Sequence, residues 1–368
     1  MQKRVVVGMS GGVDSSVSAY LLKKEGYDVV GLFMRNWDSM INGDFEGNPN
    51  DGPICPQEQD YNDAKSVCEK LGIPLYRVDF IKEYWDDVFM YFLEELKKGR
   101  TPNPDLMCNK YIKFDLFIKE ALKLGADFVA TGHYARCVNG NLLRGLDDNK
   151  DQTYFLAQVP RDSFKNVLFP IGHLTKPEVR KIAEEIGLVT AKKKDSTGIC
   201  FIGERNYQKF LHNYLKPNPG DIIDVDTLEK VGEHTGLMNY TIGQRRNVGL
   251  SGYSDKHYVV GKNVEKNILY IAFKEDNEYL YSDACKITDI NFISEKRPQN
   301  CTAKFRYRSK DVAVELKYVN DFEIIVEYKG RTTGVTPGQA CVLYDGEECL
   351  GSGIIDEVYK NGEKLWYL

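Results

Sequence analysis

A stretch rich in glycine and serine, residues 8–16 (GMSGGVDSS), has the composition of a phosphate-binding turn. It follows the apolar run Val5–Val7 and precedes apolar residues at helical spacing, so it is expected to join a strand to a helix. Gly11 and Gly12 allow the backbone to take positive φ, so that several N–H groups can point at one anion beside the positive helix N-terminus. Three hydroxyl groups add donors: those of Ser10, Ser15 and Ser16. These residues predict a cradle for phosphate groups.

The cradle lacks the lysine of a P-loop. P-loop kinases and ATPases need G-x-x-x-x-G-K-[ST], in which the lysine reaches the terminal phosphates, and its absence here points away from γ-phosphoryl transfer. The stretch resembles the SGGVDS loop of the N-type ATP pyrophosphatases, which holds pyrophosphate while an acceptor oxygen attacks the α-phosphate to give an adenylate. This resemblance implies ATP and places Asp14 near a metal ion, but it does not identify the acceptor. A plain Gly-Ser turn is the alternative.

The first cysteine segment is residues 99–110 (GRTPNPDLMCNK), which is not periodic. Pro102 and Pro104 fix their own φ and hold the preceding residues extended. We expect three side chains to be presented just before the next helix: those of Asn103, Asp105 and Cys108. Near a helix N-terminus and close to Lys110 and Lys113, the pKa of Cys108 would be lowered, which favours a nucleophilic thiolate. A reactive and a buried Cys108 both remain open.

The second cysteine segment is residues 192–203 (KKKDSTGICFIG), in which three lysines precede an apolar turn that contains Cys200. An exposed basic run followed by a buried cysteine is one interpretation. The flanking glycines, Gly198 and Gly203, instead favour a mobile or tightly turned backbone. Together with Cys108, this segment predicts a two-thiol site, because a thiolate that receives sulfur as a persulfide and a second thiol that resolves it form one chemical unit.

Other polar or glycine residues follow predicted strands. Met34 ends the apolar run 29–34 and either packs on a bound adenine or belongs to the core. Gly132 follows the run 126–131 and permits close approach of a nucleotide, whereas the neighbouring His133 is best interpreted from the residues as a core histidine. A polar triplet, Lys150, Asp151 and Gln152, opens a further short apolar run.

Composition limits the class of protein. The chain has 368 residues, enough for two or three domains, and 49 basic against 54 acidic residues give a net charge of −5. Any nucleic-acid contact must therefore be local. The nine cysteines include no CxxC pair, which indicates reduced thiols, and Cys68 falls on the apolar stripe of a helix. With no signal-peptide pattern or long apolar run, we expect a soluble, cytoplasmic protein.

The pattern along the chain predicts an α/β protein with three parts. Strand, helix and strand alternate in residues 1–207, which predicts a parallel sheet. The resemblance of the 8–16 stretch implies that this part is a catalytic domain of the ATP-pyrophosphatase (adenine nucleotide hydrolase-like) type. A Pro/Gly boundary near residues 217–220 introduces a small central β-rich domain, 208–284. Period-two alternation in 285–368 predicts a β-barrel. If the strand through Phe305 and Tyr307 is regular, its opposite face is basic, through Arg306, Arg308 and Lys310, although such faces are commonly only solvated.

From end to end the chain resembles the bacterial tRNA-specific 2-thiouridylases. The motifs that carry the resemblance are GMSGGVDSS (8–16), PNPDLMCNKYIKF (102–114), TGHYAR (131–136), KDQTYFL (150–156), KKDSTGICFIGER (193–205), YTIGQR (240–245) and PGQACVLYDGEECLGSG (337–353). The resemblance implies thiolation of C2 of the wobble uridine in certain tRNAs. Asn247 departs from the family, which usually has glycine there, and this leaves only the detail of that loop in doubt.

The resemblance assigns roles residue by residue. The positions that match the ATP contacts of the family are Gly8, Met9, Ser10, Gly11, Gly12, Val13, Asp14, Ser15, Met34 and Gly132. Those that match its contacts to the target base are Asn103, Pro104 and Asp105, and those that match its tRNA-contacting stretches are Lys150, Asp151, Gln152, Tyr307 and Arg308. Cys108 matches the nucleophile and Cys200 the persulfide carrier.

The implied mechanism starts from a poor leaving group, the uracil carbonyl oxygen, which adenylation converts to AMP. The cradle and Mg²⁺ would stabilise the departing pyrophosphate. Sulfur from a Cys200 persulfide, supplied by an upstream sulfur-donor protein, then attacks C2 directly, or Cys108 releases it as sulfide; both routes pass through a transient Cys108–Cys200 disulfide. Asp105 is a candidate acid/base, and the target base must leave the anticodon stack.

Two other classes of function compete with this interpretation. An ATP-dependent adenylating ligase or amidating enzyme would use the same cradle but needs no pair of thiols. A non-catalytic RNA-binding protein would use the barrel and its basic residues alone. For tRNA binding by an acidic chain, we expect a local basic track formed by Lys150, Lys192 to Lys194, Arg306 and Arg308.

Overall fold

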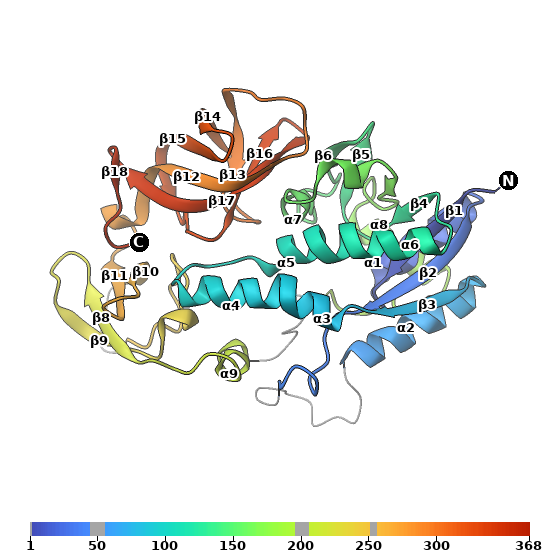
Figure 1. The fold of residues 1–368 in the computed structure, drawn as a ribbon, viewed down its shortest axis with the longest axis horizontal. Coiled ribbons are helices and arrows are strands. Elements are labelled where there is room, and N and C mark those ends of the chain that lie inside the picture. The colour runs from blue at the N-terminus through green and yellow to red at the C-terminus, as the bar shows by residue number, and fades with distance from the viewer. Residues whose placement is uncertain (1, 45–55, 196–205, 251–255) are drawn as a thin grey trace.

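The computed structural model describes residues 2–44, 56–195, 206–250 and 256–368, and its first part is built on a parallel sheet (Figure 1). The strands are β1 (Arg4–Met9), β2 (Asp28–Arg35), β3 (Leu75–Asp79), β4 (Phe128–Ala130) and β7 (Val167–Leu168), in the order β3-β2-β1-β4-β7. All neighbouring strands in this sheet are parallel. β1 is the central strand, and Val5, Val6 and Val7 are fully buried, as expected for a strand covered on both faces.

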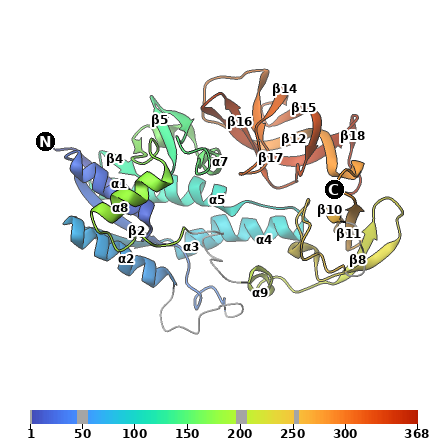
Figure 2. The same cartoon turned by 180° about the vertical axis from the view of Figure 1, so that it is seen from behind.

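Alternate residues of β1 face two different layers of helices. Val5 and Val7 pack with residues of α1 (Val13–Lys24), α2 (Pro56–Leu71) and α8 (Lys176–Glu185), which lie together on the side seen in Figure 2. Val6 packs with the other layer, which is a longer helical column. The members of that column are α3 (Ile81–Tyr84), the π-helical segment Trp85–Phe89, α4 (Met90–Lys97), α5 (Pro104–Met107), the π-helical segment Cys108–Leu116 and α6 (Phe117–Lys123).

The strand order reverses at β1, because β2 and β3 lie on one side of it and β4 and β7 on the other. Ligands of open parallel sheets bind outside the carboxyl ends of the strands at this switch point. Residues 10–12 leave β1 there, and Gly132 follows β4 at the same edge. The topology therefore brings the glycine-rich turn and Gly132 to the place where a nucleotide is expected.

The small middle sheet has the order β10-β11-β8-β9 and packs around a core of its own that includes Ile222, Val259 and Leu269. Its strands are β8 (Gly220–Asp224), β9 (Lys230–His234), β10 (His257–Asn263) and β11 (Ile268–Phe273), and α9 (Tyr207–His212) precedes it. Asn247 has a φ of 59°, so the asparagine adopts the left-handed conformation that a glycine would adopt readily.

The last part is a closed barrel of six strands in the order β12-β15-β14-β13-β16-β17, because β12 also pairs with β17. The strands are β12 (Tyr281–Phe292), β13 (Asn300–Lys304), β14 (Val312–Asn320), β15 (Glu323–Thr333), β16 (Ala340–Asp345) and β17 (Glu348–Lys360), and β18 (Glu363–Lys364) pairs with β17. This confirms the predicted fold class of parallel sheet, central β-rich part and barrel.

The first part and the barrel are joined by backbone hydrogen bonds. The hairpin of β5 (Ala135–Val138) and β6 (Asn141–Arg144) extends from the first part, and Leu143 pairs with Glu348 of β17. The Arg144 N–H also donates to the Glu347 carbonyl at 2.9 Å. The barrel therefore has a fixed position relative to the sheet that carries the cradle.

The predicted basic strand face on the barrel is wrong. β13 ends at Lys304, and residues 305–309 form a turn. Arg306 turns inward: its Nε donates to the Gly334 carbonyl at 2.9 Å, and its Nη2 to the Ile242 carbonyl at 2.5 Å. The guanidinium satisfies carbonyl groups of the barrel and of the middle part, so Arg306 is not available to a basic track.

Two further observations concern the helices: where Cys108 lies in its helix, and how long and apolar the described helices are. The helix that carries Cys108 begins at Pro104, earlier than the sequence predicted, so Cys108 lies in its second turn and its N–H is bonded to the carbonyls of Pro104 and Asp105. Within the described ranges, no helix is long and apolar enough to cross a membrane.

Candidate functional site

The cradle turn depends on one glycine in particular. Gly11 has a φ of 69°, and a Cβ at this position would lie 2.2 Å from the Asp60 carbonyl oxygen of α2. Gly12 has a φ of −97° and caps α1 from the extended region, so of the two glycines that permit positive φ only Gly11 adopts it. Among the residues that the structure describes, the N-cap residue Gly12 gives α1 no side-chain cap. The first amides of this helix are therefore left for an anion, as in known phosphate sites.

The three hydroxyl groups of the cradle shape the turn itself. Ser10 Oγ and Ser15 Oγ lie 3.1 Å apart, and the Ser16 hydroxyl donates to the Gly12 carbonyl at 2.7 Å. The Ser15 hydroxyl donates to the same carbonyl at 3.2 Å. Because Ser15 and Ser16 are buried, these bonds fix the path of the turn.

Gly132 is required by packing against the cradle. A Cβ on Gly132 would lie 2.7 Å from Ser15 N and 2.9 Å from the Asp14 carbonyl carbon. The end of β4 therefore touches the first turn of α1. Any larger residue at position 132 would displace the cradle, whether or not a nucleotide is present.

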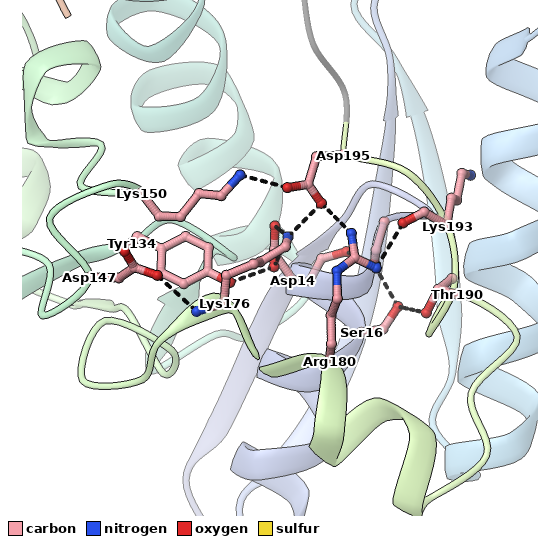
Figure 3. A network of polar contacts seen from close by, with 12 residues as sticks. Asp14, Ser16, Tyr134, Asp147, Lys150, Lys176, Arg180, Thr190, Lys193 and Asp195 are labelled. Atoms are coloured by element: carbon pink, nitrogen blue, oxygen red, sulfur yellow. Dashed lines mark hydrogen bonds and ion pairs between the residues drawn. The ribbon is translucent and has the colours of Figure 1, made fainter. Parts of the chain in front are cut away.

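Asp14, the acidic residue of the cradle, is held by two side chains that sequence reasoning did not identify (Figure 3). Lys176 Nζ lies 2.8 Å from each of its carboxylate oxygens, and the Tyr134 hydroxyl donates to Asp14 Oδ1 at 2.9 Å. Lys176 is the first residue of α8 and its side chain is only 10% exposed. The nearest sequence signal was the capping box formed by Thr175 and Glu178, which predicted the helix but not its use.

The same arrangement does not fit a metal ion held by the protein. Magnesium sites use carboxylate oxygens, and both oxygens of Asp14 already accept from an ammonium group. Within the described residues, no group of three or more His, Cys, Asp or Glu side chains could hold a metal ion. The placement of Asp14 near a metal therefore has no support in this geometry.

A second carboxylate, Asp195, lies in the same network and contacts three cations. Its oxygens are 2.6 Å from Lys150 Nζ, 2.9 Å from Lys176 Nζ and 2.6 Å from Arg180 Nη2. Partial burial acts to raise the pKa of Asp195, but hydrogen bonds from Lys150 and Lys176 outweigh it and hold the pKa at about 2. Asp195 is therefore ionised at neutral pH, and Lys176 bridges it to Asp14.

The start of the second cysteine segment, together with the residues just before it, runs alongside the cradle. Lys193 Nζ donates to the Gly11 carbonyl at 3.0 Å and contacts Asp60 at 2.7 Å and Asp63 at 2.5 Å. The Thr190 hydroxyl donates to Ser16 Oγ at 3.2 Å. A lysine thus reaches the cradle from a distant segment, although the loop itself has none. Cys200 lies outside the described residues.

The first cysteine segment presents a half-buried carboxyl group and a buried thiol. Asn103 Oδ1 accepts from the Asp105 N–H at 3.2 Å and caps the helix, and Cys108 is 1% exposed. Burial raises the pKa of Asp105, and the nearby positive charge of Lys113 opposes this rise. Asp105 therefore has the altered proton affinity expected of an acid/base group. Pro104 is buried in the first turn of the same helix.

The barrel holds the strap 100–103 that leads to these residues. The Thr101 N–H donates to the Pro337 carbonyl at 2.9 Å, and Gln339 Nε2 donates to the Thr101 carbonyl at 2.6 Å. Arg100 pairs with Asp356 of β17 at 2.9 Å. Sequence reasoning assigned the barrel to tRNA contact alone and missed this role; the PGQA motif at 337–340 was its only local signal.

The residues predicted to contact tRNA come from two stretches that the structure brings together. The ring of Tyr307 lies 4.4 Å from that of Phe155, just after the triplet 150–152. Within the triplet, the buried Asp151 carboxylate accepts from the Thr153 hydroxyl, and Gln152 Oε1 accepts from the Tyr134 N–H at 2.9 Å. Arg308 is exposed.

The ammonium groups assigned to the basic track divide into two kinds. Those of Lys150 and Lys193 are paired with carboxylates, whereas Lys192 and Lys194 are exposed. In the predicted basic track, carboxylates therefore partly neutralise the charges of Lys150 and Lys193, and the guanidinium of Arg306 is not available to phosphate.

His133 and Met34 lie at the carboxyl ends of the central strands. His133 is buried, its Nδ1 is 2.8 Å from Thr131 Oγ1, and burial lowers its pKa well below the ordinary value. This confirms the interpretation of His133 as a neutral core histidine. Met34 is half-buried against the cluster that contains Val30 and Leu32.

Comparison with protein families matches the chain in three successive segments. Residues 3–204 match the tRNA methyl transferase HUP domain, residues 208–273 the tRNA methyl transferase PRC-barrel domain, and residues 282–355 the aminomethyltransferase beta-barrel domain.

Full-length relatives are similar to the whole chain. The tRNA-specific 2-thiouridylase MnmA of Metamycoplasma arthritidis is 57% identical over 100% of both chains. MnmA 2 of Geobacillus kaustophilus is 53% identical over 100% of this chain and 98% of its own. Among solved structures, a 4-thiouridine synthetase–RNA complex with bound ATP matches at a TM-score of 0.34 and 18% identity, over 54% of this chain and 44% of that chain, which is too distant to carry an argument.

Proposed function

The chain belongs to the tRNA-specific 2-thiouridylase family and is a tRNA sulfurtransferase, and on this premise we propose that it adenylates the C2 carbonyl of the wobble uridine with ATP before it transfers sulfur. The observation that carries the proposal is the uncapped N-terminus of α1 behind Gly11, at the switch point of the parallel sheet. Its free amides suit the pyrophosphate that adenylation releases.

The helix of the first cysteine segment supports the second half of the proposal. Pro104 to Lys123 form one continuous helical run, and a Cβ at Gly8 of β1 would lie 3.4 Å from the Phe117 ring of that run. The helix therefore packs directly under the strand that leads to the cradle. In our proposal, Asn103, Pro104 and Asp105 at its start receive the target base, and the elevated pKa of Asp105 lets it exchange a proton with the uracil ring.

We propose that sulfur arrives on Cys200 as a persulfide, delivered by a donor protein. In one route, the terminal sulfur attacks C2 and expels AMP, and the Cys108 thiolate then attacks Cys200 Sγ and frees the thiocarbonyl sulfur. In the other, Cys108 first attacks Cys200 Sγ and releases sulfide, which attacks C2. Both routes leave a Cys108–Cys200 disulfide, which a thiol reductant must reduce with two electrons.

The ATP contacts of the proposal are the cradle residues 8–15 together with Met34 and Gly132. Mg²⁺ is proposed only as a companion of the ATP phosphates, since the side chains in the described part of the chain form no cluster of three or more His, Cys, Asp or Glu that could hold it. For tRNA, Arg308 and the exposed Lys192 and Lys194 are the proposed phosphate contacts. Tyr307, Lys150 and Gln152 are proposed to extend this surface, and the buried Asp151 holds the backbone of the triplet through Thr153.

The experiment that tests this function combines purified protein, ATP, Mg²⁺, unmodified tRNA and a chemical persulfide source. The proposal predicts AMP, pyrophosphate and 2-thiouridine, identified by chromatography and nucleoside mass spectrometry. An amidated product that depends on ammonium would instead indicate the ligase class. Binding of tRNA without any ATP cleavage would indicate the RNA-binding class.

A further inference from the structure

Lys176 occupies a position that none of the proposed roles uses. Its ammonium lies 2.8 Å from both oxygens of Asp14 in the cradle and 2.9 Å from Asp195 Oδ1, which belongs to a separate segment. Figure 3 shows the three side chains within one network between the cradle and α8. One buried cation thus joins the ATP loop to Asp195 in the first part of the second cysteine segment.

The backbone around Lys176 is fixed independently of these ion pairs. The Lys176 N–H donates to Asp147 Oδ2 at 2.9 Å, and the Thr175–Glu178 capping box sets the start of α8. The Tyr134 ring, 5.7 Å from Nζ, lies on one side of the ammonium. Because the backbone of Lys176 is fixed by these contacts, its side chain can hold the two carboxylates in place.

The charges of the network favour an anion at the cradle only while Lys176 is present. Asp14 is the second residue of α1 and lies in its first turn, where an unpaired carboxylate would repel incoming phosphates. Lys176 neutralises this carboxylate through contacts with both of its oxygens. Asp195 is paired with Lys150 and Arg180 as well, so it remains ionised and holds Lys176 toward Asp14.

We propose that Lys176 is a positioning residue for the reaction: it holds Asp14 of the cradle and Asp195 in one fixed arrangement, so that ATP affinity depends on Asp195 through Lys176. This inference rests on the proposed use of ATP. It assigns Lys176 no contact with the reacting atoms. Its consequence is that a change at Asp195, outside the cradle, alters ATP binding.

The proposal is tested by calorimetry, which measures the Kd for ATP in Mg²⁺ buffer for the full chain and four variants of it. Lys176→Met is expected to raise the Kd for ATP about tenfold or more, and Lys176→Arg to restore most of the affinity, since a guanidinium can also pair with two carboxylates. Asp195→Asn is expected to raise the Kd at least threefold. Lys181→Met, on the exposed side of the same helix, is the matched control and should leave the Kd unchanged.

The double variant Lys176→Met/Asp195→Asn decides whether the effect passes through Lys176. We expect its Kd to equal that of Lys176→Met, because the link is already broken. Three results would each overturn the proposal. The first is that the two changes multiply their effects on Kd in the double variant. The others are an unchanged Kd in Asp195→Asn and a Kd of Lys176→Met within twofold of that of Lys181→Met. If Lys176→Met does not fold, as judged by circular dichroism, Asp195→Asn alone carries the test, and an unchanged Kd for ATP in that variant overturns the proposal.

Two readouts separate this inference from the proposed function. In steady state, Lys176→Met should raise KM for ATP with a smaller effect on kcat, and should leave tRNA affinity unchanged, whereas a general loss of structure would lower both kcat and tRNA affinity. A wild-type protein that does not bind ATP, or that gives ADP, contradicts the proposed function itself. A wild-type protein that forms AMP while Lys176→Met binds ATP normally contradicts only the role of Lys176.

Discussion

Gly338 of the barrel lies directly against Thr101 of the strap that precedes the helix of Cys108. Its φ is 90°, and a Cβ on Gly338 would lie 2.9 Å from Thr101 N. The adjoining hydrogen bond from Thr101 N–H to the Pro337 carbonyl shows that the two backbones are in close contact. The barrel therefore sets the position from which Asn103, Asp105 and Cys108 follow.

We expect Gly338→Ala to displace the strap and lower thiolation at least tenfold while ATP binding at the distant cradle is retained. Gly346→Ala is the control, because Gly346 also has positive φ, 59°, but a Cβ there meets nothing within 4 Å. Both changes carry the backbone strain of about 1 kcal/mol, so only the contact with Thr101 differs. Equal thiolation rates in the two variants would show that the barrel does not position the strap.

The paired-thiol hypothesis predicts that Cys108→Ser abolishes thiolation, as does Cys200→Ser. Cys68→Ser is the control: Cys68 is 1% exposed on the other side of the sheet, and burial raises its pKa to about 12, so it has no tendency to form a thiolate. Nucleoside mass spectrometry with a persulfide as the sole sulfur source gives the readout. Thiolation that persists in Cys200→Ser would exclude its role as carrier.

Asp105→Asn should separate stability from activity. A carboxyl group whose pKa is raised in the folded state gives its full stability only below the unfolded pKa, and this is lost as pH rises through the folded pKa. The variant should therefore gain free energy of unfolding relative to wild type at pH 7, with the difference shrinking in acid, and should lose thiolation. Urea unfolding at several pH values measures this, with exposed Asp115→Asn on the same helix as control. A variant less stable than wild type at pH 7 would contradict the burial argument.

Arg308 and Arg306 are predicted to behave differently although they are close in sequence. Arg308→Ala should weaken tRNA binding and reduce the slope of log K against log salt by a little under one unit, because an exposed phosphate contact is lost. Arg306→Ala should mainly lower the free energy of unfolding, by about 1–3 kcal/mol, because the carbonyl of the buried Ile242 loses its guanidinium donor and the Gly334 carbonyl keeps only the Thr336 hydroxyl. If Arg308→Ala leaves both affinity and slope unchanged, the barrel is not the docking surface.

Local patterns predicted the cradle and the three-part fold, because the turn residues and the strand and helix periods lie within short stretches of sequence. The strand expected through Phe305 failed because the chain turns after Lys304 and directs Arg306 to carbonyls of another part. Lys176 and Asp14 are 162 positions apart, and Gln339 and Thr101 are 238 apart, so no local pattern could reveal either contact. Gly12 is a smaller example of what sequence could not predict. The sequence permits positive φ at both glycines, but only Gly11, which lies close to Asp60, adopts it.

The most direct test of adenylation is a single-turnover reaction with α-labelled ATP, excess protein preloaded with persulfide, and unmodified tRNA. The proposed function predicts that AMP and pyrophosphate form in a tRNA-dependent manner, one of each for every 2-thiouridine made. Stoichiometric ADP and phosphate in place of AMP and pyrophosphate would contradict it.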